Sequence, residues 1–139
     1  MSNLETFEEA VFIPAVGSEE ELAQAAYLAC LADPSRQGKF LARSAHRKIG
    51  AVKIPENLEL VSASPGRDLS GVNFKHSETM IREGAFEPIE KWIRKLGGHI
   101  HCHIRNVVKQ IAEHGDQAIV IASEKVVLGV VVLKVVKAI

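Results

Sequence analysis

Two runs of β-branched residues near the end of the chain constrain its fold most. Residues 118–122 read Ala-Ile-Val-Ile-Ala and residues 126–133 read Val-Val-Leu-Gly-Val-Val-Val-Leu, with only Ser-Glu-Lys between them. Apolar runs of this length, bounded by turn residues, are typical of buried strands. The sequence therefore predicts two neighbouring buried strands. The chain then ends in residues 134–139, Lys-Val-Val-Lys-Ala-Ile, without a cap or stop, and we expect the polypeptide to continue into another domain.

The composition is that of one globular domain spanning residues 1–139. The chain is 47% hydrophobic and 24% charged, which is enough apolar sequence for a core. Its formal net charge is zero, so we expect no nucleic acid partner and no pull toward an anionic membrane. No apolar run approaches the ~20 residues of a membrane helix. We interpret Cys30 as a reduced core thiol, which favours a cytoplasmic setting.

Helix signals are clearest in the first third of the chain. Ser18 followed by Glu21 predicts an N-cap with a capping box, and Asp33-Pro34 predicts the end of that helix. A second helix is predicted from position 34 or 35 to Ile49, with Gly50 closing it. The fragment is expected to be soluble and monomeric, because no heptad pattern or large apolar stripe is left without a partner.

The remaining pattern completes an α+β fold. Strands are predicted at 8–14 and 58–61, a hairpin at 69–74 and 78–82, and helices at 87–96 and 104–113. Hairpins predominate over strict alternation of strands and helices. This order favours a mainly antiparallel β-sheet flanked by α-helices.

Several segments, in order along the chain, resemble the nucleotide-binding (N) domain of the Kdp-type potassium-transporting P-type ATPase, B subunit. Residues 28–33, Leu-Ala-Cys-Leu-Ala-Asp, with Gly38-Lys39 resemble its Leu-Ala-Ser-Leu-Ala-Asp…Glu-Gly-Arg segment. Residues 69–72, Leu-Ser-Gly-Val, resemble its Met-Ser-Gly-Val, and residues 81–85, Ile-Arg-Glu-Gly-Ala, resemble its Ile-Arg-Lys-Gly-Ala. Residues 9–14, 97–99 and 126–134 are also similar to that domain.

The resemblance implies a twisted antiparallel sheet that holds ATP at the cytoplasmic face of the cell membrane. Mg²⁺ accompanies the nucleotide in the intact pump, and the partners are the phosphorylation and membrane domains of a parent chain. The sequence contains no Asp-Lys-Thr-Gly motif, so we expect the isolated domain not to form an aspartyl phosphate. The alternative is a degenerate relative of this domain that has lost nucleotide binding and serves as an interaction or regulatory module, for which the histidine run described below offers a metal site.

The resemblance also assigns site residues. The family's adenine-stacking phenylalanine falls near Leu60, which lacks a π face and could equally be a core strand residue. The family's lysine falls on Glu83, whose negative charge would repel phosphate. We expect ATP on one face formed by Leu60, Ser70, Gly71, Glu83, Gly84 and Glu87, binding at about millimolar or weaker.

Besides Leu60, four assigned positions keep a second interpretation. Arg67 lies near the rim of the pocket in the family and could replace the lost positive charge or be a solvated loop residue. Asp33 and Lys39 match the family motif, but either could be a cap or a surface charge. Glu87 could be an ordinary acidic residue of a helix's first turn.

A histidine run provides a second constellation, which the resemblance does not explain. His99, His101 and His103 would point to one side of an extended segment, a spacing that suits zinc, nickel or copper. The alternative is a solvated histidine-rich loop, and we expect metal binding no tighter than that of a histidine tag. The other histidines are interpreted as surface residues.

Overall fold

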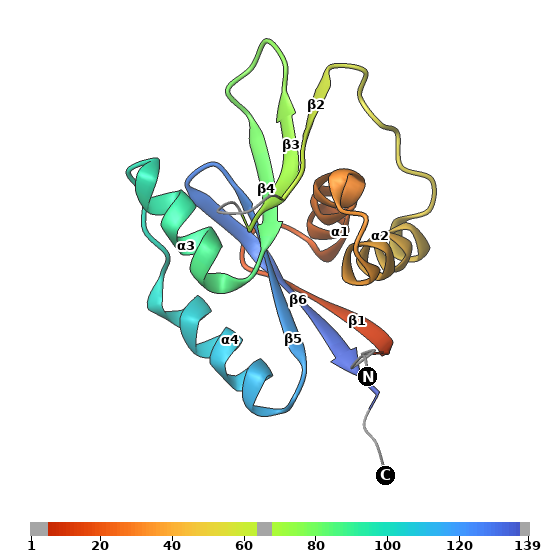
Figure 1. The fold of residues 1–139 in the computed structure, drawn as a ribbon, viewed down its shortest axis with the longest axis vertical. Coiled ribbons are helices and arrows are strands. Elements are labelled where there is room, and N and C mark those ends of the chain that lie inside the picture. Colours follow the sequence, from red (N-terminus) through yellow and green to blue (C-terminus); the bar gives the residue numbers. More distant parts are fainter. Residues whose placement is uncertain (1–5, 64–67, 137–139) are drawn as a thin grey trace.

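The computed structural model describes residues 6–63 and 68–136, which form a six-stranded antiparallel sheet. The strands are β1 (Phe7–Pro14), β2 (Leu58–Val61), β3 (Ser70–Phe74), β4 (Met80–Gly84), β5 (Gln117–Ser123) and β6 (Val126–Val135). Their spatial order is β1-β6-β5-β4-β3-β2, and every neighbouring pair is antiparallel. The sheet is twisted, and β1 and β2 are its edges (Figure 1). The predicted α+β class with an antiparallel sheet is confirmed.

Helices cover both faces of the sheet (Figure 1). The helices α1 (Glu19–Ala29) and α2 (Arg36–Ile49), with the short 3₁₀ helix η1 (Cys30–Ala32) between them, lie on one side, which we call the α1 face. The helices α3 (Phe86–Lys95) and α4 (Cys102–Glu113) lie on the other, which we call the α3 face. Each face has its own hydrophobic cluster.

The continuous apolar runs of β5 and β6 follow from this two-sided packing. Ile119 and Ile121 belong to the cluster under α1, whereas Val120 and Ala122 belong to the cluster under α3. Residues 130–133 of β6 alternate between the two clusters in the same way. Because both faces are covered, neither set of alternating positions is polar, and the strands contain unbroken apolar sequence.

The predicted helix boundaries in the first third of the chain are confirmed. The Ser18 hydroxyl accepts a hydrogen bond from the Glu21 amide (3.1 Å), and Glu21 Oε1 accepts one from the Ser18 amide (2.9 Å). Ser35 caps the start of α2, and Gly50 ends it with a φ of 78°. These local bonds satisfy backbone groups that helix termini leave open.

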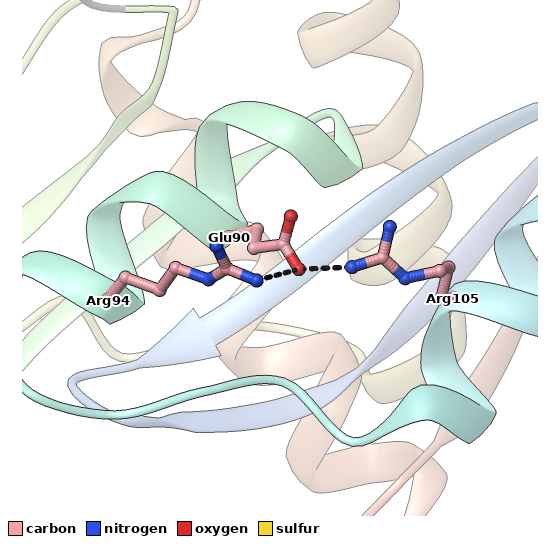
Figure 2. A network of polar contacts seen from close by, with 3 residues as sticks. All are labelled: Glu90, Arg94 and Arg105. Carbon is pink, nitrogen blue, oxygen red and sulfur yellow. Dashed lines mark hydrogen bonds and ion pairs between the residues drawn. The ribbon is translucent and has the colours of Figure 1, made fainter.

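An ion-pair network joins the two helices of the α3 face (Figure 2). Glu90 of α3 accepts from Arg105 of α4 at 2.6 Å and from Arg94, one turn further along α3, at 3.4 Å. The Arg105 guanidinium also lies 5.1 Å from the centroid of the Phe86 ring. Its position over the ring fixes the side chain that bridges the two helices.

The first and last described residues lie side by side. The Val136 amide donates to the Thr6 carbonyl at 2.8 Å, just beyond the paired ends of β1 and β6. In the parts of the chain that the structure describes, no helix combines the length and apolar character needed to span a membrane. Cys30 is buried and unpaired, in agreement with its interpretation as a core thiol.

Candidate functional site

A hollow of about 510 Å³ opens on the α1 face, between the end of α1, the start of α2 and strand β3. Three of the residues assigned from the sequence line it, namely Asp33, Lys39 and Ser70. The other lining residues are mainly apolar: Tyr27, Cys30, Leu31, Ala32, Pro34, Ala42, Ser62 and Ala63. Its volume lies within the range of about 300–1,000 Å³ that is usual for small-molecule sites. We call it the α1 hollow.

Two residues that line the α1 hollow, Ser70 and Cys30, contact a buried glutamate. The side chain of Glu83 is directed to the α1 face, where it is only 3% exposed. Ser70 lies opposite Glu83 in the register of β3 and β4, and its hydroxyl donates to Glu83 Oε1 at 2.7 Å. The Cys30 thiol lies 3.9 Å from the same oxygen. Register and helix packing thus bring together residues from three elements.

Glu83 and Asp33 share one proton. Burial, together with the hydrogen bond to Asp33, raises the pKa of Glu83 to about 9, although the hydrogen bond from Ser70 acts to lower it. Burial by itself would raise the pKa of Asp33, but hydrogen bonds from Glu83 and Ser35 hold it below its usual value. At pH 7 Glu83 is therefore neutral and Asp33 is ionised. The expectation that an ionised Glu83 repels phosphate is wrong, because this carboxyl group keeps its proton.

Asp33 is held in place by the start of α2. The Ser35 amide donates to Asp33 Oδ1 at 3.0 Å. Gly38 packs against the same carboxylate, since a Cβ at Gly38 would lie 2.5 Å from Asp33 Oδ2. Asp33 thus has the local capping role that the sequence left open, and it also lines the hollow.

The prediction that six residues form a single binding face is wrong. Side chains alternate along a strand, so Ser70 and Glu83 face α1, whereas Gly71 lies opposite Arg82 on the α3 face. Glu87, in the first turn of α3, lines a separate hollow of about 430 Å³ together with Arg82 and Trp92. The assigned residues are therefore divided between the two sides of the sheet.

Packing accounts for both assigned glycines of β3 and β4. A Cβ at Gly71 would collide with the carbonyl of Ile81 on the neighbouring strand, and one at Gly84 would lie 2.7 Å from Leu69 Cδ2. Neither residue has a positive φ. Both positions need glycine because the Ile81 carbonyl and the Leu69 side chain occupy the space that a Cβ would fill.

Two further assigned residues lie away from the α1 hollow or cannot be placed. Leu60 is on the edge strand β2 and is 54% exposed, so the alternative that it is a core residue is wrong. It is not among the described residues that line the α1 hollow. Arg67 lies outside the described residues.

Sequence reasoning missed Tyr27 and Arg82. Tyr27 is the aromatic residue among the described residues that line the α1 hollow. A tyrosine beside the apolar stripe of α1 was the sequence feature that could have indicated it. Arg82 is buried on the α3 face, 5.2 Å from the centroid of the Trp92 ring, and donates to the carbonyls of Val72 and Ile81. Its position next to Glu83 in a predicted strand could have indicated that the two side chains lie on opposite faces of the sheet.

The histidine run does not form the extended segment that three ligands on one side would need. Helix α4 begins at Cys102 rather than at the predicted Ile104, and His101 is its N-cap. The His101 Nδ1 accepts from the His103 amide at 3.1 Å. Within residues 6–63 and 68–136, no group of three His, Cys, Asp or Glu side chains is placed to hold a metal ion. His46, His76 and His114 are exposed, as predicted.

Comparison with solved structures identifies the fold class as that of P-type ATPase N-domains. The N-domain of HMA8, a copper-transporting P-type ATPase, matches 91% of this chain and all of its own with a TM-score of 0.69, at 11% identity. A zinc-transporting PIB-type ATPase matches 94% of this chain and 20% of its own with a TM-score of 0.65, at 17% identity. These matches define the class by fold alone.

Sequence relatives identify the branch of this class. The potassium-transporting ATPase ATP-binding subunit of Clostridium botulinum (strain Alaska E43 / Type E3) is 38% identical over 127 residues, or 88% of this chain. The subunit of the same name from Erwinia tasmaniensis is 33% identical over an equal share. The resemblance to the Kdp-type family is confirmed. The chain spans only 18% of the length of these relatives. No family model matches the chain.

Proposed function

We propose that this chain is the ATP-binding domain of a Kdp-type, cation-transporting P-type ATPase, and that ATP binds in the α1 hollow. One observation carries the choice of site. Asp33, Lys39 and Ser70 belong to two separate segments that resemble the family, and they line one hollow, in which Ser70 also donates to the buried Glu83. The names of the sequence relatives supply the ligand, since these proteins are ATP-binding subunits.

The chemistry of the hollow suits a nucleotide that enters base first. Its lining is mainly apolar and includes the Tyr27 ring, which supplies a flat aromatic surface in a chain that lacks the family's phenylalanine. Lys39 is exposed at the rim, where its ammonium group can reach a phosphate. Asp33 already accepts hydrogen bonds from Ser35 and Glu83, so we assign no magnesium ligand here, and Mg²⁺ would accompany the phosphates.

The role in the parent protein follows from the same proposal. The domain would hold ATP while a separate domain of the parent chain supplies the aspartate that is phosphorylated, and membrane domains would move potassium. It would lie at the cytoplasmic face of the cell membrane and act as a monomeric domain without catalytic activity of its own.

A titration followed by NMR tests the proposal. We expect ATP and AMP-PNP to shift the amide signals of residues 27–33, Lys39, Ser62 and Ser70, with a dissociation constant of about a millimolar. Glu87→Gln, on the opposite face, serves as the matched control and should leave the titration unchanged. Shifts confined to residues 61, 68–69, 82 and 87 would move the site to the α3 face, and an absence of shifts at saturating ATP would refute nucleotide binding.

A further inference from the structure

A further hollow, of about 520 Å³, opens on the α3 face and shares no lining residue with the α1 hollow. It lies between the end of β1, the turn that joins β5 to β6, and the start of α4. The sheet contributes Ile13 of β1, which lies opposite the buried Val130 of β6, and α4 contributes Ile104 and Val107. The volume is usual for a small-molecule site. We call it the α4 hollow.

The α4 hollow gathers apolar surface that the protein leaves in water. Large hydrophobic side chains that stay exposed are few in the described part of the chain, and half of them line this hollow. They are Ile13, Val16 and Val126, which are 39%, 48% and 49% exposed. An apolar patch with a polar rim is typical of an interaction site, and covering it with an apolar ligand is favourable.

The polar residues that line the α4 hollow are all basic. They are Lys125 and the three histidines of the run, His99, His101 and His103, and all four are exposed. No acidic residue is among the described lining residues, and Glu124, next to Lys125 in the turn, does not line the hollow. Lys125 takes part in none of the ion pairs formed by the described residues. Its ammonium group is therefore available to an anion.

Two glycines allow Lys125 to lie against the connection between α3 and α4. A Cβ at Gly98 would lie 3.0 Å from Lys125 Cβ and 3.3 Å from Lys125 Cγ, so the lysine stem packs on this glycine. A Cβ at Gly97 would lie 3.8 Å from Lys125 Nζ. The ammonium group thus lies beside the segment that leads directly into the histidine run.

His101 adds a hydrogen-bond donor to the same rim. As the N-cap of α4, it accepts a hydrogen bond from the His103 amide on Nδ1, at 3.1 Å. A ring nitrogen that accepts carries no proton, so the proton of the neutral imidazole is on Nε2. The capping bond therefore fixes the tautomer in which His101 offers an N–H group, and a carboxylate oxygen is a strong acceptor for such a group.

We propose that the α4 hollow binds a small amphipathic carboxylate, a molecule with an apolar chain and one negative head group. The apolar lining takes the chain, and Lys125 with the imidazoles of the histidine run takes the carboxylate. A cationic head group is disfavoured, because it would meet Lys125 with no acidic lining residue to offset the repulsion. The histidine run thereby gains a role that needs no metal. This site is independent of the proposed ATP site.

Three ligands that share one alkyl chain test the proposal: octanoate, octanol and octylammonium. Each is titrated into the chain of residues 1–139 at pH 7 and followed by NMR, at concentrations where it forms no micelles. We expect octanoate to shift the amide signals of residues 15–16, 99–104 and 125–127, with a dissociation constant of about a millimolar. Octanol should bind about fivefold more weakly, and octylammonium at least about tenfold more weakly.

Exposed substitutions separate the head group from the chain. Lys125→Gln should weaken octanoate binding about fivefold and leave octanol binding unchanged. Lys109→Gln, at an exposed lysine of α4 that does not line the hollow, is the matched control and should change neither. Val16→Ser, at an exposed residue outside the strands and helices, should weaken both ligands about threefold. An amide spectrum of each variant checks that the fold is intact.

Two results would overturn the proposal. Equal affinity for octanoate and octanol, or an unchanged affinity of Lys125→Gln for octanoate, would show that the rim does not recognise a carboxylate. If none of the three ligands shifts these signals, the α4 hollow is not a small-molecule site, and cosedimentation with phosphatidylglycerol vesicles would show whether the patch binds a lipid surface instead. The ATP titration is read at residues 27–33, 39, 62 and 70, so each site can fail without the other.

Discussion

Strand β4 sends two neighbouring ionisable residues to opposite faces of the sheet, and the faces accommodate them in different ways. On the α3 face, the buried Arg82 stays charged, lies over Trp92 and donates to two backbone carbonyls. On the α1 face, the buried Glu83 gives up its charge by keeping a proton that it donates to Asp33. The arginine therefore finds backbone carbonyls as acceptors, whereas the glutamate keeps a proton and carries no charge.

This difference shows why adjacent residues of opposite formal charge do not pair here. A strand separates consecutive side chains by the thickness of the sheet, so each must find its partners in its own layer. On the α3 face, the Glu90–Arg105 ion pair joins two helices (Figure 2), and the hollow of about 430 Å³ lies beside Arg82. On the α1 face, Ser70 and Cys30 line the α1 hollow and contact the buried acid. Each buried ionisable residue thus lies next to a hollow of its own face.

Removing the buried cation should have the largest effect on stability. Arg82→Ala leaves two carbonyls without their donor and removes the contact with Trp92, so we expect the free energy of unfolding to fall by about 3 kcal/mol. Urea denaturation measures this loss. Arg94→Ala, at a mainly exposed arginine, is the control and should cost less than about 0.5 kcal/mol. A loss below about 1 kcal/mol for Arg82→Ala would mean that the α3 face does not depend on its buried cation.

Replacing the buried acid Glu83 by glutamine should raise the free energy of unfolding rather than lower it. The pKa of Glu83 is about 9 in the folded state against an ordinary value of 4.5, so the folded protein holds a proton that the unfolded chain has lost between these pH values. Stability must therefore decrease as the pH rises through this window. Glu83→Gln removes the dependence and should stabilise the protein relative to the wild type by an amount that grows from pH 6 to pH 9.

Denaturation at pH 6, 7, 8 and 9 measures this effect, with Glu87→Gln as the exposed control. The comparison of the two faces would break down if wild-type stability were flat or rose with pH across this window. The comparison would also break down if the stability of Glu83→Gln and that of the wild type changed with pH in the same way.

The smallest effect concerns the two ion pairs of Glu90, one with Arg105 of α4 and one with Arg94 of α3 itself. A double-mutant cycle on Glu90 and Arg105 should give a coupling of about 0.5–1 kcal/mol, because Glu90 is mostly buried whereas Arg105 is exposed. The cycle on Glu90 and Arg94, joined at 3.4 Å rather than 2.6 Å, should give less. Equal couplings would show that the bridge between the helices is not distinct from a surface pair within one helix.

The fold was largely predictable from the sequence, because its signals are local. Capping residues at Ser18 and Ser35 mark helix starts, and the valine-rich run of β6 marks a strand covered on both faces. The start of α4 was missed because His101 caps it, and histidine is not among the usual N-cap residues.

The site was predictable only in part. The hairpin of β3 and β4 places Ser70 opposite Glu83, but the position of Asp33 depends on how η1 packs against β3, which no local pattern encodes. Assigning Gly71, Glu83 and Gly84 to one face ignored the alternation of side chains along a strand. The charge state of Glu83 depends on burial, and burial is a property of the tertiary structure.

The opposite placement of Arg82 and Glu83 also bears on strand alignment during folding. If β4 slipped by one residue, every side chain would change layer, and Arg82 would enter the apolar cluster under α1 while Glu83 met the Trp92 ring. A misaligned β4 would bury a cation and an acid without their partners. Gly71, opposite Arg82 in the native pairing, has no room for a side chain, so a shifted β3 is excluded as well. The residues of the β3–β4 hairpin thus disfavour misaligned pairings of these strands, next to the proposed nucleotide site.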